Sequence, residues 1–68
     1  MNRMKAIRAE LGMSQTKLTM KTGLTQSILS QIENDKREPH MGWKRKIARA
    51  FKMEIADVFP EEKGEEKR

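Results

Sequence analysis

Residues 14–34 read SQTKLTMKTGLTQSILSQIEN, and this stretch decides the fold. Ser14 and Thr25 each precede a short helix-forming run, where a hydroxyl can accept a hydrogen bond from a backbone N–H at the helix start. Gly23 lies between the two runs and can adopt the left-handed conformation that ends a helix. The spacing therefore predicts two short helices, over about 15–22 and 26–34, which cross at a steep angle because residues 23–25 alone connect them.

The second helix of this pair has two different sides. Leu29 and Ile32 share the side that would be buried, at helical spacing. The opposite side is small, polar and uncharged, and it comprises Ser27, Gln31 and Asn34, with Ser30 beside them and Gln26 in the exposed first turn. Such amides and hydroxyls suit base edges, since glutamine and asparagine can pair bidentately with adenine. The pattern favours a helix-turn-helix whose second helix lies in the DNA major groove, against the alternative of a merely polar surface.

Apolar spacing predicts three further helices around the central pair. Met4, Ile7 and Leu11 lie on one face of a first helix that Gly12 would end. A stripe of Trp43, Ile47, Ala50 and Phe51 predicts a helix over about 42–51, and a short helical turn over 55–59 would cover the core. We therefore expect an all-α, five-helix DNA-binding domain over residues 1–59, followed by a disordered charged tail over residues 60–68.

Length and composition exclude several classes of protein. A chain of 68 residues allows one domain. The absence of cysteine and the single histidine exclude a zinc finger, a redox site and a disulfide scaffold. No phosphate-binding glycine loop occurs, and so small a core leaves little room for a substrate pocket, so we expect no enzyme, no cofactor and no small-molecule site. The longest uncharged stretch, residues 22–32, is too short to span a bilayer, and we expect a cytoplasmic protein.

The chain has a formal net charge of +5. That charge lies within residues 1–59, whereas residues 60–68 are mildly acidic. Lys36 and Arg37 directly follow the helix with the uncharged face, and four more basic residues lie on the helix after it. A basic surface suggests a polyanionic partner, although composition alone is equally compatible with a solvated surface that happens to be basic.

Residues 8–39, RAELGMSQTKLTMKTGLTQSILSQIENDKREP, resemble the helix-turn-helix domains of phage repressors and Cro, the xenobiotic-response-element type. The similarity extends over residues 4–59. It implies a repressor-like fold and a transcriptional regulator that binds duplex DNA, with a homodimer repressing from a palindromic operator. The resemblance assigns base reading to Gln26, Ser27 and Gln31. The places of Ile28, Ser30 and Asn34 on the same helix make them secondary candidates.

The resemblance also implies roles for residues outside the reading face. Gln15 matches a glutamine that contacts a phosphate and braces the recognition helix. Arg8 and Glu33 match an ion pair between the first and third helices. The helical wheel supports this pair independently, because Arg8 falls within an apolar stripe and Glu33 on the flank of its helix. Family members grip phosphates with the loop after the third helix and the start of the fourth, which here indicates Lys36, Arg37 and Lys44.

The sequence departs from the family pattern at several positions. Thr19 stands where alanine is usual, so its hydroxyl must find a backbone carbonyl or free space. Lys52 replaces a common glycine after the fourth helix, and Glu54 replaces a common serine cap. Lys44 occupies a usual leucine position, and Trp43 is apolar where the family is often polar.

Three questions stay open at this point. Trp43 packs either at the edge of the core or in a dimer contact. Ile28 either touches a thymine methyl or is a scattered surface residue. The domain as a whole could instead be a protein-interaction module, such as an antitoxin or an anti-repressor partner, which presents the same fold to another protein.

Overall fold

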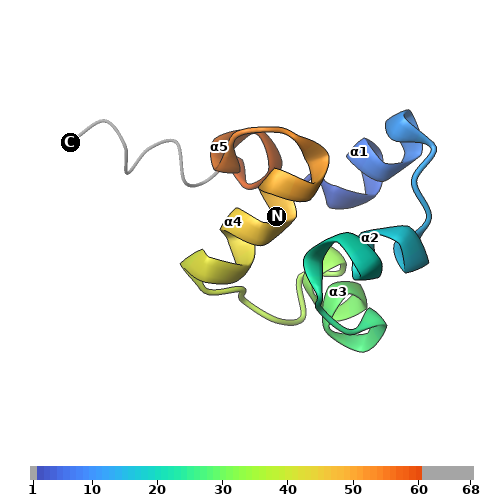
Figure 1. Ribbon diagram of the computed structural model, residues 1–68. Helices are drawn as coiled ribbons and strands as arrows, with labels where there is room; N and C mark the ends of the chain where they lie inside the picture. Colours follow the sequence, from blue (N-terminus) through green and yellow to red (C-terminus); the bar gives the residue numbers. More distant parts are fainter. Residues whose placement is uncertain (1, 61–68) are drawn as a thin grey trace.

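The computed structural model describes residues 2–60, and within that range it contains five helices and no strand (Figure 1). The helices are α1 (Met4–Leu11), α2 (Gln15–Thr22), α3 (Gln26–Glu33), α4 (Met41–Phe51) and α5 (Ile55–Val58). The all-α, five-helix prediction is thereby confirmed. Residues 61–68, which form most of the predicted charged tail, lie outside the described residues.

The predicted helix ends are confirmed in atomic detail. Ser14 Oγ accepts a hydrogen bond from the N–H of Lys17 at 3.0 Å, which caps α2. Thr25 Oγ1 accepts one from the N–H of Ile28 at 3.1 Å, which caps α3. Gly23 ends α2 with a φ of 78°, a left-handed conformation that glycine adopts without steric cost. These local signals fix where the two central helices begin and end.

The core receives apolar side chains from all five helices. The buried members are Met4, Ile7, Leu18, Leu24, Leu29, Ile32, Ile47, Ala48, Phe51, Val58 and Phe59. Leu11, which shares a predicted apolar face with Met4 and Ile7, is 50% exposed and lies outside this core. It is the last residue of α1, so no further turn of that helix shields its side chain.

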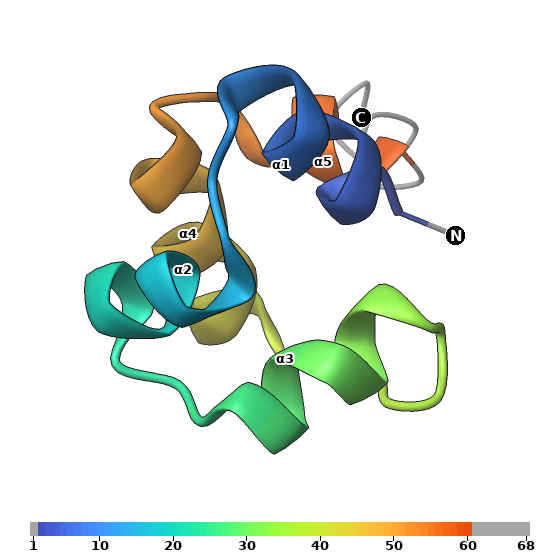
Figure 2. The same cartoon turned by 90° about the vertical axis from the view of Figure 1, so that its right-hand side faces the viewer.

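The packing of the helices leaves α3 at one edge of the molecule. α2 packs against both α3 and α4, and α4 packs against α5. α3 runs along the lower edge in Figure 2, while the turn between α4 and α5 lies at the top. The backbone N–H of Arg3 donates to the carbonyl of Val58 at 2.9 Å and so ties the start of the described chain to α5. Within residues 2–60, no helix combines the length and the apolar character that crossing a bilayer requires.

The departures from the family pattern at the end of α4 have physical solutions. Lys52 adopts the left-handed conformation, with a φ of 60°, where a glycine is common in the family. That conformation costs a residue with a Cβ about 1–2 kcal/mol. Glu54 and Asp57 form a reciprocal capping box, in which the Glu54 N–H donates to Asp57 Oδ2 at 3.1 Å. Glutamate therefore starts α5 in place of serine.

Candidate nucleic-acid interface

The outer side of α3 carries the side chains predicted to read bases. Gln26 and Ser27 are exposed in its first turn, and Ser30 and Gln31 are half-buried further along. Leu29 and Ile32 are fully buried on the inner side. The predicted division of this helix into a buried apolar side and an uncharged polar side is confirmed.

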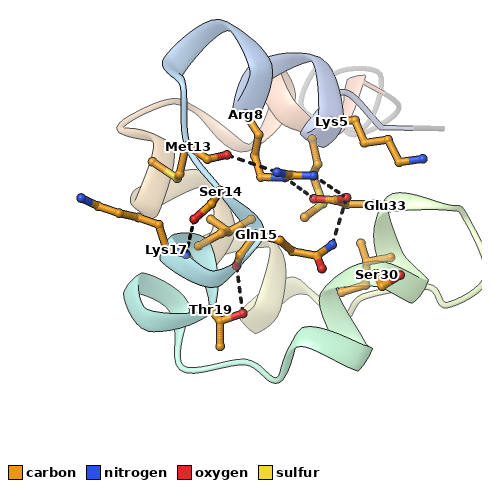
Figure 3. Close-up of polar contacts among 12 residues, drawn as sticks. Lys5, Arg8, Met13, Ser14, Gln15, Lys17, Thr19, Ser30 and Glu33 are labelled. Carbon is orange, nitrogen blue, oxygen red and sulfur yellow. Dashed lines mark hydrogen bonds and ion pairs between the residues drawn. The ribbon is translucent and has the colours of Figure 1, made fainter.

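A buried ion pair holds α3 against α1 (Figure 3). Arg8 Nε donates to Glu33 Oε2 at 2.7 Å, and Arg8 Nη2 donates to Glu33 Oε1 at 3.1 Å. The side chain of Glu33 is 2% exposed, and that of Arg8 is 20% exposed. A two-bond pair of this kind fixes distance and orientation together. The ion pair expected from the helical wheel is therefore confirmed, and it determines how α3 is presented.

α2 also supports the Glu33 carboxylate, in addition to the contacts from α1. Gln15 Nε2 donates to Glu33 Oε1 at 3.3 Å, and Figure 3 shows its side chain reaching from the start of α2 toward α3. Thr19 Oγ1 donates to the carbonyl of Gln15 at 3.0 Å, so the hydroxyl in place of alanine is satisfied within its own helix. The bracing role expected of Gln15 is confirmed, whereas its contact with a phosphate stays a prediction.

Gln31 and Arg37 meet at the end of α3. Arg37 Nε donates to Gln31 Oε1 at 2.6 Å. The guanidinium carbon of Arg37 also lies 5.9 Å from the ring centroid of Trp43, within the range of a cation–π contact. Sequence reasoning assigned Gln31 to bases and Arg37 to phosphates, and it did not foresee that the two side chains would bond to each other.

Trp43 lies at the edge of the core, as the first of its two interpretations predicted. It is half-buried and packs against the buried cluster. The His40 ring lies 4.7 Å from its own ring, centroid to centroid. His40 Nδ1 also accepts a hydrogen bond from the Trp43 N–H at 3.3 Å, which caps α4. The structure thus gives Trp43 contacts within its own chain, to the core, His40 and Arg37.

The expected phosphate contacts separate into two groups. Lys36 and Arg37 are exposed in the loop after α3. Lys44 is only 5% exposed, with its Nζ 5.5 Å from the Phe59 ring centroid and 3.4 Å from Glu38 Oε2. Its assignment to a phosphate is therefore corrected, because a buried ammonium is not available to DNA. The sequence signal for this burial was position 44 itself, which is usually occupied by leucine in the resembled family.

Two secondary base-contact candidates have other tasks in the structure. Asn34 Nδ2 donates to the carbonyl of Ser30 at 2.8 Å, and Asn34 Oδ1 accepts from Lys5 Nζ at 2.7 Å. Both ends of its carboxamide are therefore engaged within the protein. Ile28 is half-buried and packs against the core, so it is not the scattered surface residue of one alternative. Ser30 is half-buried near this site, and its contact with a base stays a prediction.

Sequence reasoning missed three polar residues that position α3 and the turn before it. Asn2 Nδ2 donates to the carbonyl of Ile32 at 2.8 Å, and Lys5 makes the bond to Asn34 described above. Thr22 is buried, and its Oγ1 accepts from the N–H of Leu24 at 3.2 Å inside the turn before α3. Asn2 and Lys5 lie 30 and 29 residues before the residues that they contact, so no local pattern signals these bonds. Thr22 directly precedes Gly23, and a threonine at the start of a turn commonly bonds to the turn backbone, which was the available sequence signal for its contact.

Comparison with known proteins agrees with this geometry. A family model described as helix-turn-helix matches residues 4–58. The HTH-type transcriptional regulator YgzD of Bacillus subtilis (strain 168) is 38% identical over 58 residues, which cover 85% of this chain and 88% of YgzD. A similarly described regulator of Archaeoglobus fulgidus is 35% identical and is 81% covered. The regulator y4dL of Sinorhizobium fredii is 44% identical over 52 residues, which cover 26% of its length.

Proposed function

We propose that this chain, which belongs to the helix-turn-helix family of DNA-binding transcriptional regulators, inserts α3 into the DNA major groove and reads bases with Gln26, Ser27 and Gln31. It acts in the cytoplasm by binding alone, with no catalytic step. Occupying an operator would block access of the polymerase, so repression is the proposed outcome.

One observation carries this proposal: α3 is held rigidly from its inner side while its outer side presents uncharged polar groups. The buried pair of Arg8 and Glu33, with the bond from Gln15, fixes the inner side. Gln26 and Ser27 are exposed on the outer side. Base reading needs side chains that donate and accept hydrogen bonds from a fixed frame, because each base pair is distinguished by its pattern of donors and acceptors.

Phosphate contacts supply most of the affinity in the proposed complex. Lys36 and Arg37 are exposed just past the end of α3, and Gln15 begins the helix before the turn. Contacts of this kind position the protein on the duplex without selecting a sequence. Each cation that neutralises a phosphate releases counterions, so the affinity should fall steeply as salt is raised.

The proposed active form is a homodimer on a palindromic operator. One domain of this size presents a single α3 and reads only one half-site. In this docking class two half-sites lie about 34–36 Å apart, which is one helical turn of DNA. A symmetric pair of domains would double the number of bases read and give the operator its two-fold symmetry.

Selection of bound duplexes from a randomised library tests the proposal most directly. The expected result is a consensus made of two inverted half-sites. The affinity for that consensus is then measured over a range of salt concentrations, for the wild type and for Lys36→Ala. Loss of one phosphate contact should reduce the slope of log K against log salt by about one.

Lys52→Asn is the matched control for Lys36→Ala. It removes one positive charge from the turn between α4 and α5, which lies at the opposite end of the molecule from α3 (Figure 2). Asparagine tolerates the left-handed backbone there. Equal slopes for the two variants would contradict the assigned phosphate contacts. No binding to any duplex at low salt would overturn the proposed function and favour a protein-interaction module.

A further inference from the structure

The two ends of the Gln31 carboxamide are not equivalent in this structure. Its carbonyl oxygen accepts a hydrogen bond from Arg37 Nε at 2.6 Å. Among residues 2–60, the structure gives its amide nitrogen no acceptor. The side chain is therefore oriented so that its N–H groups, rather than its carbonyl oxygen, are available to a ligand.

Arg37 is itself held from a second side. Its guanidinium lies over the Trp43 ring at 5.9 Å, and Trp43 packs against His40 in the first turn of α4. A guanidinium is always charged, so its attraction to an aromatic ring restrains its position while its N–H groups stay available for hydrogen bonds. The orientation of Gln31 is thus tied through Arg37 to α4 and the core.

We propose that Arg37 is a specificity-determining residue, which sets Gln31 to read guanine rather than adenine. This proposal rests on the proposed function, since it concerns the base that α3 meets in the major groove. The groups of the Gln31–Arg37 pair that remain unengaged within residues 2–60 are N–H donors, and the one acceptor atom, Gln31 Oε1, is already bonded to Arg37. Guanine is the one base whose major-groove edge offers two acceptors, O6 and N7.

The usual pairing of glutamine with adenine requires the atom that Arg37 occupies. In that pairing the glutamine oxygen accepts from the adenine N6 amino group while its nitrogen donates to N7. Here Arg37 already donates to Gln31 Oε1 and places a positive charge beside it. The adenine amino group would have to share that oxygen with Arg37 and lie beside its positive charge, whereas guanine O6 and N7 would meet the N–H groups of Gln31 Nε2.

The neighbouring Lys36 provides an internal comparison. Both residues are exposed cations in the loop after α3, and the removal of either lowers the positive charge by one. Only Arg37 bonds to the Gln31 side chain. A pure charge effect would therefore be shared by the two residues, and a change of base preference would belong to Arg37 alone.

The test compares base preference in four proteins: the wild type, Gln31→Ala, Arg37→Met and Lys36→Met. The position of the selected site at which Gln31→Ala loses its base preference is taken as the base pair that Gln31 reads. Affinities are then measured for duplexes that carry guanine or adenine there, on the strand that the protein prefers. Thermal unfolding of each free variant checks folding, and both loop positions are exposed.

The wild type should prefer guanine over adenine by roughly 5- to 150-fold. Arg37→Met should lose that preference or reverse it toward adenine, because Gln31 Oε1 becomes available. Lys36→Met should weaken both duplexes equally and keep the ratio. The proposal is overturned if the wild type prefers any base other than guanine at this position, or if Gln31→Ala relaxes no position. It is also overturned if Arg37→Met keeps the wild-type ratio of guanine to adenine affinity. Failure of the wild type to bind any duplex would instead refute the proposed function, and this proposal with it.

Discussion

Replacing Arg8 with methionine should remove about a third or more of the stability of the domain. The substitution leaves the Glu33 carboxylate in the interior, where its side chain is 2% exposed, with the 3.3 Å bond from Gln15 as its remaining support. Breaking one partner of a buried pair typically costs about 3–5 kcal/mol, and the surviving bond places the expected loss near 3 kcal/mol. The total stability of a chain this long is roughly 3–10 kcal/mol, so the loss is a large fraction of it.

Chemical and thermal denaturation followed by circular dichroism measure this loss. A cost of about 3 kcal/mol corresponds to a fall in Tm of roughly 12–24 °C for a domain of this size. Arg45→Met is the matched control, because Arg45 is exposed on α4 and its replacement should change stability by no more than about 0.5 kcal/mol.

A double-mutant cycle separates the pair from its surroundings. Arg8→Met combined with Glu33→Leu removes both charges, and replacing a whole buried pair by apolar residues is often neutral or stabilising. The double variant should therefore be more stable than Arg8→Met alone by at least about 1 kcal/mol. The reasoning is refuted if Arg8→Met costs no more than Arg45→Met, or if adding Glu33→Leu only lowers the stability further.

Three further substitutions test other features. Lys44→Leu should leave the affinity for duplex DNA unchanged and should be neutral or stabilising for the fold, because Lys44 is buried against Phe59. A drop in affinity with intact folding would restore Lys44 as a phosphate contact. Lys52→Gly should raise the free energy of unfolding by about 1 kcal/mol by relieving the left-handed backbone, and an unchanged denaturation midpoint would show that this backbone is not strained. Gly23→Ala should lower the free energy of unfolding by about 1–2 kcal/mol through the same backbone strain. A clash should add nothing, because no atom lies within 4 Å of the added Cβ, and a much larger loss would contradict this.

Features that depend on local chemistry were predictable from the sequence. Ser14 and Thr25 cap helices because a hydroxyl at that position has an orphan N–H within reach, and Gly23 ends a helix because it lacks a Cβ. The apolar spacing likewise placed Leu29 and Ile32 in the core. The need of Arg8 for a partner was predictable as well, since a charge inside an apolar stripe needs one, but the resemblance identified that partner as Glu33.

Features that depend on the meeting of distant side chains were not predictable in this way. Lys44 was assigned to a phosphate because the resembled family grips phosphates with the start of its fourth helix, but the close approach of Phe59 to α4 encloses it. The bond between Arg37 and Gln31 depends on the course of the loop after α3, which no periodicity describes. Asn34 was expected to face DNA, and the arrival of Lys5 from α1 engages it instead. In each case the deciding partner comes from a loop or a different helix.

The proposed reading face of α3 has a consequence for the evolution of this regulator. Within residues 2–60, the side chains of Gln26 and Ser27 form no hydrogen bond to the rest of the chain, and both are exposed. Exchanging them for other residues would cost little stability, so new operators can be acquired there one substitution at a time. Gln31 is different, because its partner Arg37 would have to change with it. Substitutions that change the target sequence should therefore accumulate quickly at Gln26 and Ser27, whereas a substitution of Gln31 should require a change of Arg37 as well.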